Sequence, residues 1–299
     1  MKRYSAVIVI VLSIICCREE PNENCIIYSS DITLNRQIEN LFKSDSIEYA
    51  EQLLRDRIST KQAKHVFYHN LGVVLFKKHA NAKENKEGYK KEILNQYHIA
   101  NNLCPNSETT IGNIVNVYHH YGDYSQTIKY GENYLSLFKP HLDMYKMLSF
   151  SYRELNDPDS SLKHAQKGIE LDSLCHYCYY LKAEALNDLE QYSEAELFYK
   201  KASESQPNVP HYLYGMGRLK YRMEDTQSAL SYYLKALELD PNDEMNLIIL
   251  SRIYFSQGNN QIACEYLSRA IDLKCLTCTT RQKKDYDEKI VELKKECAE

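Results

Sequence analysis

The sequence lacks tryptophan entirely and is poor in the residues that interrupt helices. Its 299 residues include no Trp, seven Pro and nine Gly, whereas Tyr occurs 26 times. Proline and glycine are the strongest local breakers of regular structure, so their scarcity favours long runs of helix. The many tyrosines supply large side chains that are apolar in the ring and polar at the tip.

The chain also lacks a strong excess of charge of either sign. Its formal net charge is −4, with 26% charged and 43% hydrophobic residues. A hydrophobic fraction of this size can build a buried core, which excludes a chain that is disordered throughout. No basic excess is present, so we expect no nucleic-acid partner.

Catalytic motifs are absent as well. The sequence contains no GxSxG, HExxH, Walker or GxGxxG motif, and its few glycines are scattered. The neighbouring His119 and His120 would point about 100° apart on a helix, so a metal site there would need ligands from elsewhere. We therefore predict no enzyme activity, no cofactor, no metal site and no small-molecule substrate.

The longest apolar run is too short to cross a membrane as a helix. It extends over residues 4–15 and follows the basic residues Lys2 and Arg3. A spanning helix needs roughly 20 apolar residues, whereas a short apolar run behind basic residues is typical of an export signal. We assign residues 1–16 to a signal peptide and residues 17–30 to a tether.

The pair Cys16-Cys17 behind this run resembles the lipobox of bacterial lipoproteins, in which a cysteine receives the lipid and becomes the first mature residue. Cys17 fits this pattern better than Cys16, because the residue before Cys16 is the β-branched Ile15. The resemblance implies a lipid anchor in the outer membrane of a bacterial envelope, facing either the periplasm or the exterior. An ordinary signal with two incidental cysteines is the alternative.

A helical segment recurs along the chain at a fixed interval. The stretch "ALSYYLKALELDPND", which ends at residue 243, has near-copies that begin at Ala195 and Ala263. Blocks of equal length follow one another without insertion and begin at Glu108, Leu142, His176, Pro210 and Glu244. Small residues recur at the eighth, twentieth and twenty-seventh positions of these blocks, where helices must approach closely.

This pattern resembles the tetratricopeptide repeat, a helix-turn-helix unit of about 34 residues. The resemblance implies an all-α fold, an α-solenoid of about seven repeats, because one helical hairpin cannot bury its apolar face alone. Residues 31–107 hold degenerate N-terminal repeats with a lengthened loop near 78–88, and residues 108–277 hold five regular repeats. Residues 278–299, with Tyr286, Ile290, Leu293 and Cys297 on one face, are predicted to form a capping helix.

In this family the first helix of each repeat lines a concave groove, at about its second, fifth, ninth, twelfth and thirteenth positions. Carried over to this chain, these positions hold mostly aromatic, histidine and basic residues, which are typical of interfaces. The predicted groove residues are His69, Asn113, Asn116, His119, Lys146, Arg153, Tyr177, Tyr180, His211, Tyr214, Arg218, Tyr221 and Arg252.

The function implied is a membrane-tethered scaffold that binds a peptide or partner protein in this groove, in a role such as envelope assembly. The family members that hold the carboxylate tails of chaperones use a set of Lys, Asn and Arg that no three consecutive repeats supply here. A thiol-disulfide protein that uses the cysteine pairs, or an accessory lipoprotein for glycan uptake, are the alternatives.

The ten cysteines include two CxxC pairs, Cys175 with Cys178 and Cys275 with Cys278. They lie three repeats apart, so they cannot converge on one zinc ion with bonds of about 2.3 Å. Neither pair is followed by the histidine that haem attachment requires. Each pair is expected to be a local thiol pair, either bridged in an oxidising envelope or free, and Cys264 and Cys297 are expected to approach each other.

Overall fold

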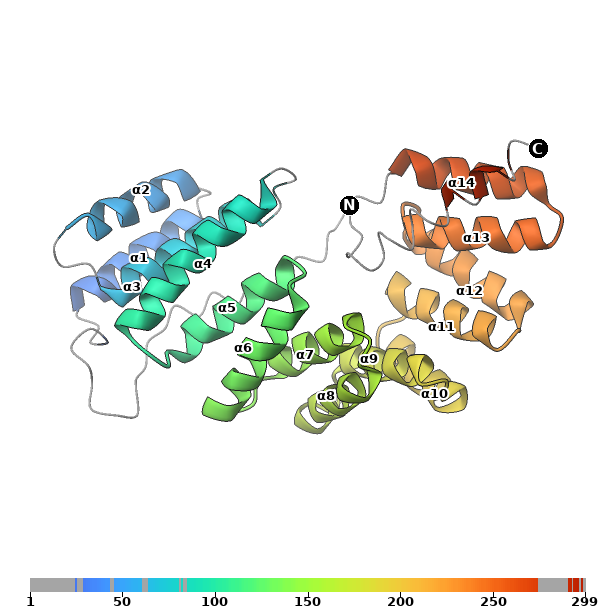
Figure 1. Cartoon of the computed structure of the whole chain (residues 1–299), viewed down its shortest axis with the longest axis horizontal. Coiled ribbons are helices and arrows are strands. Elements are labelled where there is room, and N and C mark those ends of the chain that lie inside the picture. Colours follow the sequence, from blue (N-terminus) through green and yellow to red (C-terminus); the bar gives the residue numbers. More distant parts are fainter. Residues whose placement is uncertain are drawn as a thin grey trace. The chain divides into compact units, whose positions relative to one another are not determined.

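The computed structural model describes residues 25, 29–43, 46–60, 64–80, 82, 85–273, 290, 291, 293–295 and 297. The predicted signal peptide, Cys17, and the pair Cys275 and Cys278 lie outside these residues. Within them, the regular structure is helical and the helices follow one another in pairs, which confirms the predicted all-α solenoid (Figure 1).

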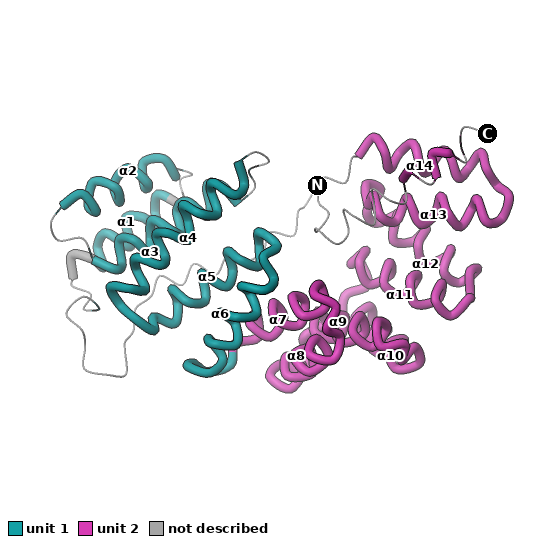
Figure 2. The backbone as a smooth tube through the Cα atoms, in the orientation of Figure 1, with its two compact units in different colours: residues 1–140 teal, residues 141–299 magenta. Residues whose placement is uncertain are grey.

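The first six helices belong to one compact unit, residues 1–140, and the others to a second unit, residues 141–299 (Figure 2). The helices of the first unit are α1 (Ser29–Lys43), α2 (Ile47–Ile58), α3 (His65–His79), α4 (Lys86–Leu103), α5 (Glu108–His120) and α6 (Tyr124–Leu137). Those of the second are α7 (Leu142–Glu154), α8 (Pro158–Leu171), α9 (His176–Asp188), α10 (Tyr192–Ser205), α11 (Pro210–Arg222), α12 (Thr226–Leu239), α13 (Glu244–Ser256) and α14 (Asn260–Leu273).

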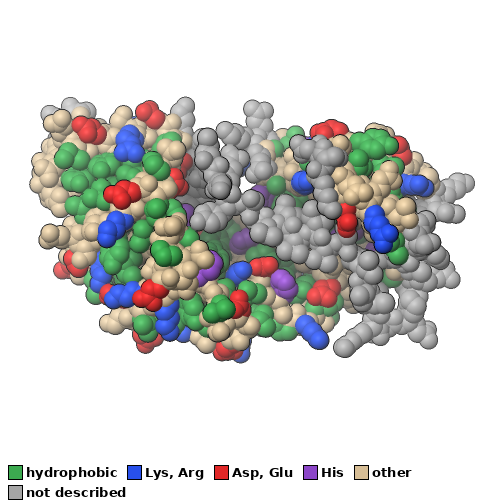
Figure 3. Space-filling model, turned by 180° about the vertical axis from the view of Figure 1, so that it is seen from behind, with side chains coloured by type: hydrophobic (Ala, Val, Ile, Leu, Met, Phe, Trp, Pro, Cys, Tyr) green, Lys and Arg blue, Asp and Glu red, His purple; other side chains and the backbone are tan. Residues whose placement is uncertain are grey.

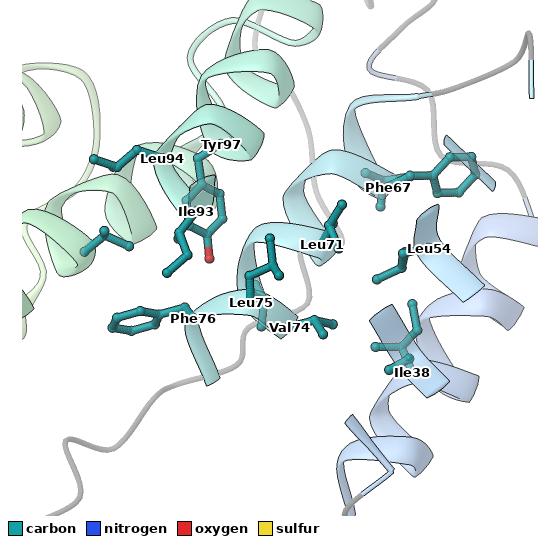
Figure 4. Close-up of a cluster of buried hydrophobic side chains, with 14 of the residues drawn as sticks. Ile38, Leu54, Phe67, Leu71, Val74, Leu75, Phe76, Ile93, Leu94 and Tyr97 are labelled. Carbon is teal, nitrogen blue, oxygen red and sulfur yellow. The ribbon is translucent and has the colours of Figure 1, made fainter. Parts of the chain in front are cut away.

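The core of the first unit is built around α3. Figure 4 shows Ile38 and Leu54, from α1 and α2, on one side of this helix, and Ile93 and Tyr97 of α4 on the other. All four side chains are buried, as is Leu71 of α3 between them. Apolar residues on more than one side of α3 explain why it is covered by neighbours on both sides, as expected for a central layer of a helical stack.

The regular part of the array keeps the period seen in the sequence. From α5 onward, each first helix has 13 residues and each second helix has 14. The first helices begin at the same residues as the five blocks identified in the sequence, namely Glu108, Leu142, His176, Pro210 and Glu244. Pairs of equal length present the same faces to each neighbour, which allows one stacking geometry to repeat.

The turn inside each regular repeat needs one residue with a left-handed backbone. This residue is Gly122, Asn156, Glu190, Glu224 or Gly258, with φ between 61° and 75°. Glycine adopts this conformation without steric cost and asparagine tolerates it, whereas other side chains are strained there. The two glutamates therefore store backbone strain that Gly122 and Gly258 avoid.

Small residues on first helices let the tyrosines of second helices lie across them. A methyl group added at Gly217 would meet the ring of Tyr233 at 2.8 Å, and one added at Gly72 would meet the ring of Tyr97 at the same distance. Both tyrosines are buried. The small residues are therefore required by helix packing and not by the turns.

The repeat formed by α3 and α4 is longer than the others, as expected, but much of the extra length is helical. We predicted a lengthened loop near residues 78–88, whereas α3 continues to His79 and α4 begins at Lys86. These helices have 15 and 18 residues, compared with 13 and 14 in the regular repeats. Polar sequence without apolar periodicity was therefore a poor guide here, because an exposed helical turn needs no apolar residue.

At the C-terminal end, Ile290 and Leu293 are buried in the cluster that also contains side chains of α12, α13 and α14. Cys297 is bonded to Cys264 of α14. These residues lie on the face predicted for the capping helix, most of which is outside the described residues. Among the described helices, none is long and apolar enough to cross a membrane.

Candidate partner-binding groove

In the first unit, the predicted groove residues take part mainly in packing. His69 is only 1% exposed, and its Nδ1 lies 3.0 Å from the hydroxyl of Thr110 on α5. Asn113 lies 3.5 Å from the other ring nitrogen of His69. Burial, and secondarily the nearby His65, lowers the pKa of His69 to about 4, so the ring is neutral at pH 7. The expectation that His69 contacts a partner is corrected, because its side chain lies inside the protein.

Of the other polar residues at the end of α5, Asn116 and His119 are half-buried and His120 is exposed. Burial, followed by the charge of His120, lowers the pKa of His119 to about 4. Nε2 of His120 lies 2.7 Å from the carbonyl oxygen of Ala80, at the end of α3. Of the predicted residues in the first unit, Asn113, Asn116 and His119 keep a partly exposed surface on α5.

In the second unit, the predicted groove residues gather around a carboxylate that the sequence analysis missed. Glu184 of α9 is 2% exposed. Its Oε2 lies 2.7 Å from Nη2 of Arg153 on α7 and 2.5 Å from Nη2 of Arg218 on α11. The hydroxyl of Tyr199, on α10, donates a hydrogen bond to its Oε1. One side chain thus connects the first helices of three consecutive repeats.

A second carboxylate extends this cluster by one helical turn. Oδ2 of Asp188 lies 2.8 Å from Nε of Arg153, and its Oδ1 lies 3.5 Å from Nη1 of Arg222. Arg222 also donates a hydrogen bond of 2.6 Å to the carbonyl oxygen of Asn187. We call Arg153, Glu184, Asp188, Arg218 and Arg222 the ion-pair cluster.

The ion-pair cluster keeps its central carboxylate charged. Burial by itself would raise the pKa of Glu184, but the guanidinium groups of Arg153 and Arg218 and the hydroxyl of Tyr199 lower it to about 2. The desolvation cost of the buried charge is therefore offset by several charge-assisted hydrogen bonds. These bonds also fix the two arginine side chains in one conformation.

Aromatic side chains lie along the same helices. The ring of Tyr180 stacks with that of Tyr177 at 5.8 Å between centroids and contacts the ring of Tyr212 at 5.2 Å. Burial raises the pKa of Tyr177 to about 12, so its hydroxyl stays neutral. Tyr214 contacts the ring of Tyr233 at 5.6 Å. Each of these rings is packed against a neighbouring ring, so its position is fixed.

The remaining predicted residues differ in how accessible they are. Lys146 is engaged at 2.9 Å by Asp143 on its own helix. His211 and Tyr221 are exposed, and Arg252 is half-buried on α13.

Several residues of this site were missed from the sequence. The two carboxylates were missed because we selected mainly aromatic and basic residues, Arg222 was left out although it lies at position thirteen of its repeat, and Tyr199 lies on the second helix α10. The missed residues are Glu184, Asp188, Arg222 and the neighbouring Tyr199. The sequence does hold a signal for Glu184, which shares the ninth repeat position with Arg218.

The cysteine pair at the start of α9 is bonded. Cys175 and Cys178 form a disulfide, and they are 5% and 0% exposed. The sulfur of Cys178 packs on Gly168 of α8, where an added methyl group would meet it at 2.8 Å. A buried disulfide in this position offers little access to an attacking thiolate.

Two further disulfides join segments that are distant in the sequence. Cys25 is bonded to Cys104 at the end of α4, across 79 residues, and Cys264 is bonded to Cys297. Six of the ten cysteines are therefore paired within the part of the chain that the structure describes. In those same residues, no three His, Cys, Asp or Glu side chains are grouped to hold a metal ion.

The second CxxC pair differs from the first in what the structure shows. Cys275 and Cys278 were also predicted as a possible disulfide, but neither Cys275 nor Cys278 is among the described residues. The three disulfides found within the described residues do not include Cys278 or Cys275. The bond between Cys275 and Cys278 therefore stays a prediction, whereas that between Cys175 and Cys178 is confirmed.

Figure 3 shows charged side chains of both signs interspersed with hydrophobic ones over one face of the described surface. No large patch of a single sign lies on the described part of this face, in agreement with the near-neutral net charge. Such a surface gives no electrostatic footprint for a nucleic acid.

Comparisons with known proteins identify the repeat. Family models named tetratricopeptide repeat match residues 176–209, 210–243 and 247–274. A tetratricopeptide repeat protein from Parabacteroides merdae is similar in structure, with a TM-score of 0.70 and 14% identity over 87% of this chain and 98% of that one. No curated protein is similar in sequence at a significant level.

Two further solved structures resemble parts of the chain. PilW, described as a widely conserved type IV pilus biogenesis factor, has a TM-score of 0.57 and 17% identity over 69% of this chain and 91% of that one. YrrB, described as a protein with an unusual peptide-binding site, has a TM-score of 0.52 and 20% identity over 66% of this chain and 97% of that one. At these identities the likeness concerns the fold alone.

Proposed function

Because this chain is a tetratricopeptide-repeat protein, we propose that it is a scaffold that binds a peptide or a partner protein along the first helices of its second unit. The observation that carries this proposal is the ion-pair cluster around Glu184, which holds Arg153 and Arg218 beside the stacked rings of Tyr177 and Tyr180. Preorganised side chains lose little conformational entropy when a ligand binds. Arginine and tyrosine are also the residue types enriched at the energetic centre of interfaces.

The same proposal includes a membrane tether and a place in the bacterial envelope. The basic and apolar N-terminal residues followed by Cys17 support it, as does the presence of three disulfides. Disulfides persist in oxidising compartments such as the bacterial periplasm and are rare in the cytosol. YrrB and PilW are by their descriptions a peptide-binding protein and a pilus biogenesis factor, and these roles are compatible with a scaffold in envelope assembly.

The test of binding uses variants that spare the ion-pair cluster. Tyr214→Ala combined with Tyr221→Ala removes two rings of the groove without touching Glu184 or its arginines. Wild type and variant are crosslinked in intact cells and the bound proteins are identified by mass spectrometry. The control is Tyr49→Ala with Leu197→Ala, two side chains that are 58% and 51% exposed on second helices.

We expect at least one envelope protein to be recovered by the wild type and the control and to be lost with the groove variant. Equal recovery by all three proteins would refute binding through these helices.

The tether is tested separately, by fractionation of cells that express wild type, Cys16→Ser or Cys17→Ser. Release from the membrane fraction by Cys17→Ser alone is the expected result. Retention of that variant in the membrane fraction would refute lipidation at Cys17.

The thiol-disulfide alternative finds no support at Cys175 and Cys178, because both sulfurs are buried. No arrangement of the described residues favours glycan uptake. We therefore propose neither function.

A further inference from the structure

Arg252 is the one basic side chain of the second unit's groove that lacks a carboxylate partner among the described residues. The groove positions of this unit hold five basic residues, Lys146, Arg153, Arg218, Arg222 and Arg252. The first four have carboxylate oxygens at 2.9, 2.7, 2.5 and 3.5 Å. Arg252 is half-buried on α13, and no carboxylate of the described chain lies within ion-pair distance of it.

The order of charges at one repeat position explains why Arg252 has no carboxylate partner among the described residues. Glu184, Arg218 and Arg252 follow one another at the constant repeat interval and so occupy the same position of three consecutive repeats. Each side chain at this position can pair with the equivalent one in the preceding repeat, as Arg218 does with Glu184. The equivalent neighbour of Arg252 is Arg218, which carries the same charge and is already paired.

At position thirteen of the repeat, acidic and basic residues also cease to alternate after α11. It holds Asp188, then Arg222, then Ser256. Asp188 pairs with Arg222, and the next repeat provides no further carboxylate at this position. The alternation of acidic and basic groups at positions nine and thirteen therefore ends on α11, and among the described residues these positions provide no carboxylate for Arg252 on α13.

An aromatic ring accompanies the arginine on each of these two helices. Tyr221 lies three residues after Arg218, and Phe255 lies three residues after Arg252, so each ring shares a helix face with its arginine. Tyr221 is 40% exposed and Phe255 is half-buried. Apolar rings next to a cation lower the local dielectric constant and strengthen its attraction to an anion.

We infer that the faces of α11 and α13 that carry Tyr221, Arg252 and Phe255 bind an acidic peptide segment. An Asp or Glu side chain of the partner pairs with Arg252, and an apolar or aromatic residue next to it packs against Tyr221 and Phe255. This inference rests on the proposed function and adds the chemical class of the partner. The site differs from the clamp for terminal carboxylates considered above, because its cation occupies the ninth repeat position and its anion comes from a side chain.

The probe is a library of random dodecapeptides displayed at the N-terminus of a phage coat protein, so that the only free carboxylates are those of side chains. The full mature chain is immobilised as wild type, as Arg252→Glu and as Lys235→Glu. Lys235 lies exposed on the second helix α12 and undergoes the same change of charge. A fourth protein carries Tyr214→Ala and Tyr221→Ala.

We expect peptides selected on the wild type to share an Asp or Glu beside an apolar or aromatic residue. Arg252→Glu should weaken their binding about tenfold to a hundredfold, the range of a charge-assisted hydrogen bond, and should select Lys or Arg instead. Lys235→Glu should bind them as the wild type does. Size-exclusion chromatography of the wild type and of Arg252→Glu shows whether a second copy of the chain occupies the site.

The outcomes separate this inference from the proposed function. Selected peptides that lack an acidic residue, or that bind Arg252→Glu as well as wild type, would overturn the inference. If such peptides bind the wild type but not the double tyrosine variant, the proposed binding along the first helices stands. Peptides that bind the double tyrosine variant as well as the wild type would overturn both the inference and the proposed function. A dimer that Arg252→Glu abolishes would overturn the inference of a peptide ligand, because a second copy of the chain would then occupy the site.

Discussion

Replacing Glu184 by glutamine should destabilise the second unit far more than a typical change of one surface charge. Glutamine keeps the shape of the side chain but removes the charge that Arg153 and Arg218 share. Removing one partner of a buried ion pair costs about 3–5 kcal/mol. Arg153 retains Asp188 at 2.8 Å and the side chain of Arg218 is 24% exposed, so we expect a smaller loss of about 2–4 kcal/mol.

The assay is equilibrium unfolding in urea, followed by circular dichroism of the full mature chain. The matched control is Glu196→Gln, which also removes a carboxylate that two cations share, Lys200 and Lys220. Glu196 lies on the second helix α10 and is more exposed, so its loss should cost about 0–1 kcal/mol. Equal losses in the two variants would refute the view that the cluster around Glu184 organises the groove.

Unfolding at acidic pH gives an independent measure of the stability that the ion-pair cluster contributes. The folded-state pKa of Glu184 lies near 2, below its usual 4.5. A lowered pKa contributes stability that is fully present above pH 4.5 and is lost as the pH falls toward 2. The free energy of unfolding of the wild type should therefore fall more steeply across this interval than that of Glu184→Gln. Parallel curves for the two proteins would contradict a lowered pKa of Glu184.

Three further changes test the packing of the repeats. Glu224→Gly relieves a left-handed backbone at φ 63° and should raise the free energy of unfolding by about 1 kcal/mol, measured by urea titration; a loss of stability would show that the glutamate side chain is needed there. Gly217→Ala places a methyl group 2.8 Å from the buried ring of Tyr233, so the free energy of unfolding, measured by thermal unfolding, should fall by about 1–3 kcal/mol. An unchanged stability would mean that the ring can move. Cys25→Ser removes the disulfide bond to Cys104 and should lower the free energy of unfolding of the first unit by about 2–4 kcal/mol. An unchanged midpoint of thermal unfolding would show that this bond does not constrain the chain.

Much of the fold could be predicted because it repeats. A constant block length and small residues at fixed positions located the first helices from Glu108 onward. The stretch after Lys77 was less predictable, because an exposed polar helix has no apolar periodicity to mark it. Our loop prediction there was too long, and α4 begins at Lys86.

The candidate site was less predictable than the fold. Repeat positions indicated Arg153 and Arg218 correctly as residues of the first helices that lie together, but they did not reveal that both arginines bind Glu184. That pairing depends on which side chains of adjacent repeats come within hydrogen-bonding distance, and a position within one repeat does not specify it. His69 illustrates the opposite error, because its position indicated a surface and the packing of α3 against α5 buried it.

The period that builds the fold also indicates where a partner is expected to bind. When every repeat places the same charge at a position, neighbouring repeats repel one another, and when charges alternate they pair within the protein. Glu184 and Arg218 alternate and are paired, whereas Arg252 follows Arg218 with the same sign. A departure from alternation costs stability in the free protein unless something else supplies the missing charge. Among the residues that the structure describes, no carboxylate pairs with Arg252, and we propose a ligand carboxylate as the source of the compensating charge.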